Sequence, residues 1–141
     1  MSSQVVRSTI MNYLAFNWII TPVYNLSDYI DKETLEIGDL PTWVGVQFLD
    51  STEEFAGVGT QCYKEAGTIV LHVASATGIP SSITMVICEQ LRDLFRGMYI
   101  GPVVIEAVDP PTDQKGEAIK FDGDWHGFAI YMDYYRYFDT P

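Results

Sequence analysis

One stretch of the chain places a strand, a turn and a helix in direct succession: Tyr63–Gly97, which reads YKEAGTIVLHVASATGIPSSITMVICEQLRDLFRG. From Tyr63 to Val73 the residues alternate, which predicts a strand with two different faces. One face holds Tyr63, Glu65, Gly67, Ile69, Leu71 and Val73, and the other holds Lys64, Ala66, Thr68, Val70 and His72. Gly78 and Pro80 then mark a turn.

The second half of this stretch, Ser81 to Arg96, predicts an amphipathic helix. Its buried stripe recurs at helical spacing and comprises Ile83, Ile87, Leu91, Leu94 and Phe95. Pro80 or Ser81 suits the first turn, Arg92 and Arg96 complement the C-terminal dipole, and Gly97 suits the left-handed residue that ends a helix. The nearby Ser75, Ser81 and Ser82 are interpreted as helix-capping residues.

Towards the N-terminus, Ser3–Phe16 predicts another helix, capped by Ser2 or Ser3. Its apolar stripe consists of Val6, Ile10, Tyr13 and Leu14. Thr21–Asn25 predicts a short edge strand, because Pro22 cannot donate a hydrogen bond to a central ladder. Residues 26–40 are polar and acidic and predict a loop with room for one helical turn.

Three further strands are predicted. Residues 43–49 alternate so that Val44, Val46 and Phe48 share one face, and residues 51–60 then predict a mobile connection with two glycines. Residues 103–108 form another strand that stops at Pro110–Pro111, and residues 112–124 are a charged turn region. The last strand covers residues 125–138, with alternating faces that hold Phe128, Ile130, Met132 and Tyr134, and Ala129, Tyr131, Asp133 and Tyr135.

The predicted order is therefore α, β, β, β, α, β, β. One sheet covered on one face by two helices is the simplest layered arrangement of these elements. The fold class that we predict is α+β, with a single mixed, mostly antiparallel sheet and two main helices packed on one face. A length of 141 residues suits one domain spanning residues 1–141.

The charge of the chain restricts its partners. The formal net charge is −11, from 19 Asp plus Glu against 8 Lys plus Arg, which disfavours binding to phosphate backbones. We therefore expect no nucleic-acid recognition, and a protein partner would carry a basic patch. No apolar run approaches the length of a membrane span, and no signal peptide is visible, so no membrane association is expected. Cys62 and Cys88 are too few for a disulfide scaffold and fit a reducing cytoplasm.

No catalytic, cofactor or metal site is predicted. His72, His126, Cys62 and Cys88 show no ligand-pair spacing. The chain has no G-x-S-x-G elbow, and its Gly57-Val58-Gly59 precedes a strand rather than a helix, unlike a dinucleotide loop. The acid pairs Glu53–Glu54 and Asp109–Asp113 lie in regions where exposed carboxylates are normal.

Aromatic residues in the last strand are candidates for an interface with another protein. Tyr131, Tyr135 and Tyr137 lie on the face opposite Met132 and Tyr134, and aromatic side chains that face away from a core are typical of interfaces. A strand buried on both faces would explain them equally well.

In the order of its motifs, the chain resembles the tail terminator, or tail completion, proteins of long-tailed bacteriophages. The features that carry the resemblance are an N-terminal helix before Pro22-Val23-Tyr24-Asn25, the strand Trp43–Phe48, the strand Tyr63–Val70, the Gly78 turn, a helix closing on Leu94-Phe95-Arg96-Gly97, and Gly123-Asp124-Trp125 opening a final aromatic strand. They cover most of the chain.

The resemblance implies a structural virion protein and not an enzyme. It implies a homo-oligomer, a hexameric ring that caps the tail tube, ends its polymerisation and provides the surface for head joining. Its partners would be the tail tube protein and head–tail connector proteins, and its location the virion tail or neck, with assembly in the host cytoplasm. The alternatives are another neck protein, such as a head-completion or connector protein, or a small enzyme or ligand-binding domain.

Such a ring needs large interfaces between subunits. We expect the connections at residues 51–60 and 110–124 and the exposed face of the last strand to supply them. The predicted interface residues are Glu53, Glu54, Phe55, Val58, Lys115, Tyr131, Tyr135 and Tyr137.

Overall fold

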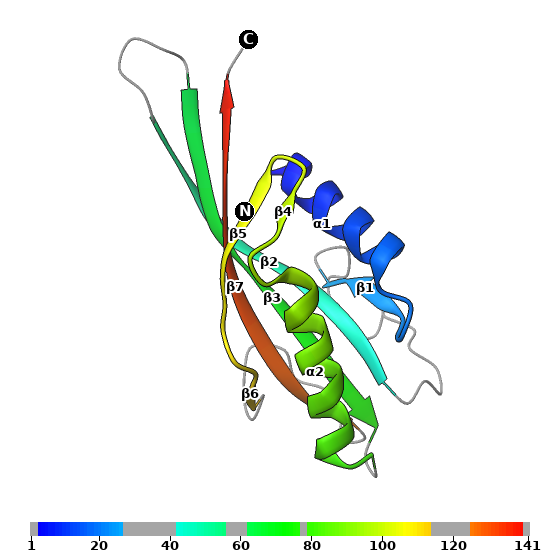
Figure 1. Cartoon of the computed structure of the whole chain (residues 1–141). Helices are drawn as coiled ribbons and strands as arrows, with labels where there is room; N and C mark the ends of the chain where they lie inside the picture. The colour runs from blue at the N-terminus through cyan, green and yellow to red at the C-terminus, as the bar shows by residue number, and fades with distance from the viewer. Residues whose placement is uncertain (1–2, 27–41, 56–61, 77–78, 114–124, 140–141) are drawn as a thin grey trace.

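Two helices and seven strands make up the fold, as seen in a computed structural model that describes residues 3–26, 42–55, 62–76, 79–113 and 125–139 (Figure 1). In chain order the elements are α1 (Gln4–Asn17), β1 (Val23–Asn25), β2 (Thr42–Phe55), β3 (Cys62–Ala76), α2 (Ser81–Phe95), β4 (Tyr99–Ile100), β5 (Val103–Val108), β6 (Thr112–Asp113) and β7 (Trp125–Asp139). The predicted α+β class is confirmed.

The strands form one mixed sheet in the order β1-β2-β3-β7-β5-β4, with β6 also paired to β7. All pairs are antiparallel except β1 with β2, which run parallel. A backbone bond from Val44 N–H to Pro22 C=O extends this parallel pair, so Pro22 lies where no N–H is needed. The prediction of an edge strand here is confirmed.

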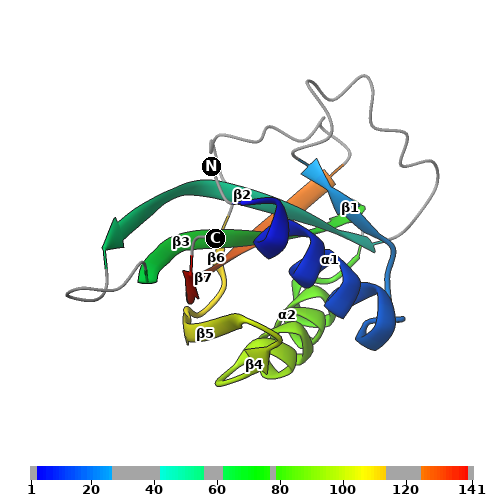
Figure 2. The same cartoon turned by 90° about the horizontal axis from the view of Figure 1, so that it is seen from above.

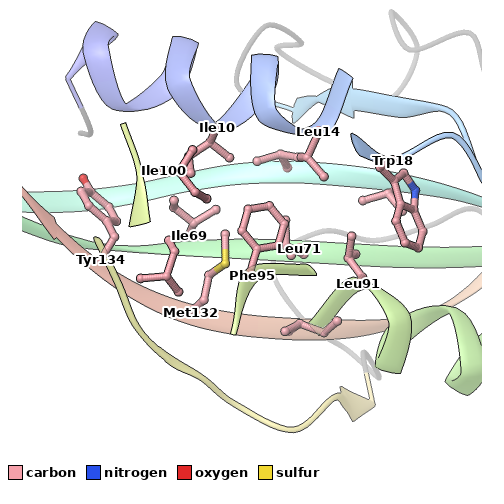
Figure 3. Packing of buried hydrophobic residues seen from close by; sticks show 14 of the residues in the cluster. Ile10, Leu14, Trp18, Ile69, Leu71, Leu91, Phe95, Ile100, Met132 and Tyr134 are labelled. Carbon is pink, nitrogen blue, oxygen red and sulfur yellow. The ribbon is translucent and has the colours of Figure 1, made fainter. Parts of the chain in front are cut away.

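Both helices cover the same face of the sheet (Figure 2). Val6, Ile10 and Leu14 of α1 are fully buried, as the stripe predicts, and they lie over the apolar rows of β2, β3 and β7. Ile69, Leu71 and Met132 form the floor of this core, and Phe95 and Leu91 close it from α2 (Figure 3). Burying each such side chain contributes roughly 1.5–3 kcal/mol.

Helix α2 is rotated relative to the prediction. Leu91 and Phe95 are buried as predicted, and Ile87 and Leu94 pack partly buried against the core. Thr84 and Cys88 are also buried, whereas Ile83 is 51% exposed. A buried hydroxyl network accounts for this, because Ser75 Oγ lies 2.8 Å from Thr84 Oγ1 and 3.2 Å from Thr42 Oγ1. These buried hydroxyls satisfy each other only when Thr84 faces the sheet.

The start and end of α2 test two smaller predictions. The N-cap is Pro80 and no side-chain cap bond forms, so the interpretation of the nearby serines as capping residues is wrong. Gly97 has φ +68°, which confirms the predicted left-handed helix end.

The predicted connection at residues 51–60 is wrong over its first half, because β2 continues to Phe55 in register with β3. A register shift between Phe48 and Ser51 interrupts the alternation of the two faces. Because of this interruption, the sequence pattern predicts that the strand ends at Leu49. Residues 56–60 lie outside the described residues. In the predicted turn region, Thr112 and Asp113 pair with β7 as a short strand.

Candidate interaction site

The most prominent surface feature is an arm, formed where three long strands run on past the helices. We define the arm as residues 51–55 of β2, 62–67 of β3 and 134–139 of β7 (Figure 1). The strands keep one register along it, from Ser51–Gly67–Tyr134 at the base to Phe55–Tyr63–Phe138 further out. β1 pairs with β2 only at Val44–Val46, and the described pairing of β5 to β7 reaches only to Tyr135. Beyond these points the described residues of the arm form a narrow, three-stranded extension.

The face of the arm on the helix side carries an aromatic row. The ring centroids of Phe55 and Tyr63 are 5.5 Å apart and those of Tyr63 and Phe138 are 5.7 Å apart. The Arg136 guanidinium carbon lies 4.2 Å from the Phe138 ring centroid, a cation–π arrangement. Phe55 remains 55% exposed. This row therefore presents apolar surface that its own chain does not fully cover.

The opposite face of the arm is also aromatic. Tyr135 and Tyr137 make an edge-on contact at 5.6 Å, and Lys64 Nζ lies 5.1 Å from the Tyr135 centroid and 6.0 Å from that of Tyr137. Tyr137 is more than half exposed. Both faces of the arm thus offer the residue types that carry most binding energy in protein interfaces.

A buried carboxylate holds the arm to the helical layer. Glu65 is fully buried, and its two oxygens accept four hydrogen bonds. Arg136 Nε donates at 2.8 Å, Tyr134 Oη at 2.9 Å, Ser3 Oγ at 2.8 Å and Ser3 N–H at 3.2 Å. Ser3 is also the N-cap of α1, so the carboxylate lies at the positive end of that helix dipole. A single side chain thereby connects the start of α1 to two strands of the arm.

These contacts decide the charge state of Glu65. Burial alone would raise the pKa of the carboxyl, but the hydrogen bonds from Ser3, Arg136 and Tyr134 outweigh that effect and lower the pKa below its usual 4.5. Glu65 is therefore ionised at neutral pH, paired with Arg136, whose side chain is only 11% exposed.

Gly67 makes room for this arrangement. A Cβ atom at Gly67 would lie 2.8 Å from Tyr134 Oη and 3.0 Å from Ser51 Cβ. Tyr134 reaches the carboxylate because its neighbour on the adjacent strand has no side chain. A small residue is thus required here for packing rather than for backbone conformation.

The predicted interface residues lie in different parts of the molecule. Glu53, Glu54 and Phe55 are exposed on the arm, and Tyr135 and Tyr137 lie on its outer face as the alternation predicts. Tyr131 shares that face but lies in the body of the sheet opposite Val70, and it is half-buried. Val58 and Lys115 lie outside the described residues. Whether these residues form an interface stays a prediction.

Sequence reasoning missed Glu65 and Arg136 as functional residues. A signal was present, since alternation placed the charged Glu65 on the same face as Ile69 and Leu71. A charge on a predicted core face is expected to have a partner, although the sequence does not say which one.

The structure also places the residues considered from the sequence for metal binding and catalysis, as far as they are described. No group of three or more His, Cys, Asp or Glu side chains there is placed to hold a metal ion. Ser75 is buried within its hydroxyl network, and His72 is buried with Nε2 2.9 Å from Gln47 Oε1. Glu53 and Glu54 are consecutive strand residues and point to opposite faces, so they cannot act as a carboxylate pair.

Neither helix of the described structure is long and apolar enough to cross a membrane.

Comparison with known proteins yields a fold likeness only. No family model matches the chain, and no curated protein matches it. Among solved structures, 19 chains match. One of them, whose recorded name is an identifier that gives no function, superposes with a TM-score of 0.56 at 16% identity, over 100% of this chain and 99% of that chain. At this identity the likeness shows that the two chains share a fold.

Proposed function

We propose that this chain is a structural subunit of a phage virion, which assembles into a hexameric ring that caps the tail tube. In this role it ends tube polymerisation and offers the surface to which the head joins. The basis is the resemblance of its motif order to tail terminator proteins, together with an architecture suited to assembly. The role needs no cofactor and no catalytic residue.

The observation that carries the proposal is the arm. It extends past the helical layer as three paired strands and presents aromatic side chains on both faces, with Phe55 and Tyr137 each 55% exposed. Exposed aromatic rows of this kind are unfavourable in a monomer and are typical of protein contacts. A subunit between two others, or between a ring and a tube, would cover both faces.

The anchor at Glu65 supports the same interpretation. An arm that protrudes from a domain loses binding energy if it must be ordered on docking. Here the buried ion pair with Arg136 and the bond to the N-cap of α1 fix its base beforehand. We infer that the arm is pre-organised for contact.

The function is tested by gene order and by an assay with a tail tube protein. The gene order itself is the first check, since the proposal expects portal, tail tube or tape-measure genes next to it. Purified tube protein is then polymerised with and without this chain and viewed by electron microscopy. We expect this chain at tube ends and shorter tubes as its concentration rises.

A matched pair of variants sharpens the assay. Tyr137→Asp on the arm should abolish capping, whereas Gln90→Asp, at a site on α2 that is also exposed, should leave it intact. Binding along the whole length of the tube, or tube lengths that do not respond to the wild-type chain, would count against the proposed function.

A further inference from the structure

A second exposed apolar surface lies at the end of α1. Phe16 is 85% exposed, Ile19 is 89% exposed and Ile20 is 54% exposed. We call these three residues the α1-end patch. Single exposed apolar residues are common, but three large ones within five positions together leave an apolar area on the order of 400 Å² open to water.

The patch lies in an uncharged stretch of the chain. No charged residue occurs between Arg7 and Asp28, although the chain has a net charge of −11. A second copy of this acidic chain therefore meets no like charge on the patch residues or on their neighbours along the chain. Arm-to-arm pairing would be less favourable, because it would bring the exposed Glu53 and Glu54 of one copy towards those of the other.

The arm and the α1-end patch lie at opposite ends of α1. The Ser3–Glu65 bonds hold the first turn of α1 at the arm. Phe16, the first residue of the patch, lies thirteen positions after Ser3, a distance of roughly 20 Å along the helix. Both views show the end of α1 directed away from the arm (Figures 1 and 2). The arm of one copy therefore cannot contact the α1-end patch of the same copy. Each copy can instead contact one neighbour through its arm and another through its patch.

We propose that the helix-side aromatic row of the arm, Phe55, Tyr63 and Phe138, docks on the α1-end patch of a second copy of this chain. Such a contact is heterologous, and head-to-tail repetition gives a ring if the rotation closes. The patch supplies about half of the roughly 800 Å² per partner that a standard interface needs, and its borders supply the rest. This contact does not depend on a role in the phage tail, whereas closure into a hexamer rests on the proposed function.

The contact is tested by self-association of three single variants. Phe55→Asp disrupts the arm, Ile19→Asp disrupts the patch, and Val86→Asp is the control, because Val86 is a 57% exposed apolar residue on α2. Light scattering and sedimentation are recorded over a wide concentration range, with thermal unfolding to show that each variant is folded. We expect the first two variants to associate roughly tenfold more weakly or worse, and the control to match the wild type.

Mixing the two disruptive variants separates this contact from any symmetric one. The Phe55→Asp chain keeps its patch and the Ile19→Asp chain keeps its arm, so the mixture should form a heterodimer with one copy of each and nothing larger. An absent heterodimer, an unaffected Ile19→Asp oligomer, or a wild-type chain that stays monomeric at the highest concentration would overturn the inference. So would binding of the wild-type chain, but not of Ile19→Asp, to phosphatidylcholine vesicles with no self-association.

The two proposals fail in different ways. Self-association through this contact without binding to tubes would overturn only the tail function. Normal tube capping by a folded Ile19→Asp chain, with an intact oligomer, would overturn only the contact proposed here.

Discussion

Replacing Glu65 by Gln is the perturbation that tests the anchor most directly. The substitution keeps the size of the side chain but removes the charge that faces Arg136 in a buried site. It also puts an amide N–H₂ in the place of one carboxylate oxygen. Each of these oxygens now accepts one hydrogen bond from Ser3 and one from β7, donated by Arg136 or Tyr134. Leaving one member of a buried ion pair uncompensated costs about 3–5 kcal/mol, and the retained Gln oxygen offsets part of this. We expect a loss of about 3 kcal/mol.

Urea unfolding followed by circular dichroism measures this loss. With a slope of about 2 kcal/mol per M, the midpoint should fall by roughly 1.5 M, with the slope itself unchanged. The matched control is Glu53→Gln, since Glu53 lies directly opposite Glu65 on β2 but is exposed. An exposed substitution of this kind is expected to change stability by no more than about 0.5 kcal/mol.

The pH dependence gives the same experiment a second readout. Because the folded-state pKa of Glu65 is lowered below 4.5, its stabilising contribution is fully present above that unfolded-state value. The contribution is lost as the pH falls through the folded-state pKa. The wild-type chain should therefore lose this part of its stability in acid, and the Gln variant should lack that part of the pH dependence. The role of the anchor would be refuted if the free energy of unfolding of the Gln variant lay within about 0.5 kcal/mol of the wild-type value and decreased in acid as the wild-type value does.

Three further predictions concern packing and thiol reactivity. Gly67→Ala would force a Cβ to within 2.8 Å of the tyrosine hydroxyl at the anchor, so we expect a loss of about 1–3 kcal/mol by urea unfolding; wild-type stability would contradict this. Burial raises the pKa of the Cys88 thiol to about 12, so a thiol reagent at neutral pH should label the partly exposed Cys62 first and Cys88 only on unfolding; simultaneous labelling of the native chain would count against the structure. Leu91→Ala should cost about 2–5 kcal/mol and Ile83→Ala under about 1, and a comparable cost at both positions would restore the helix stripe that the sequence predicts, since it holds both residues.

The sequence predicts the elements of this fold well where one periodicity dominates. Residues 103–108 form a strand with the predicted bounds, and Ser3 caps α1 as the helix-start pattern indicates. It predicts the rotation of α2 less well, because the predicted stripe, with Ile83 and Ile87, is more apolar than the observed one, which has Thr84 and Cys88 in their place. The choice between them depends on Thr84 meeting Ser75, a contact between distant elements.

The candidate site depends even more on long-range contacts. Exposed Glu53 and Glu54 look like loop residues, and only pairing with β3 and β7 makes them part of an arm. The partners of Glu65 lie 62 to 71 positions away in the sequence. Local pattern shows that a charge is buried, but register between strands decides what neutralises it.

The central place of β7 has a consequence for biosynthesis. This strand is the last element in the described chain, yet it pairs with β3, β5 and β6 and supplies Arg136 to the anchor. A ribosome that adds residues in order makes β2 and β3 before β7 exists, which leaves the edge of β3 unpaired for several seconds. We therefore expect productive folding only after the segment carrying β7 has left the exit tunnel, and expect nascent chains stalled before residue 125 to depend on chaperones.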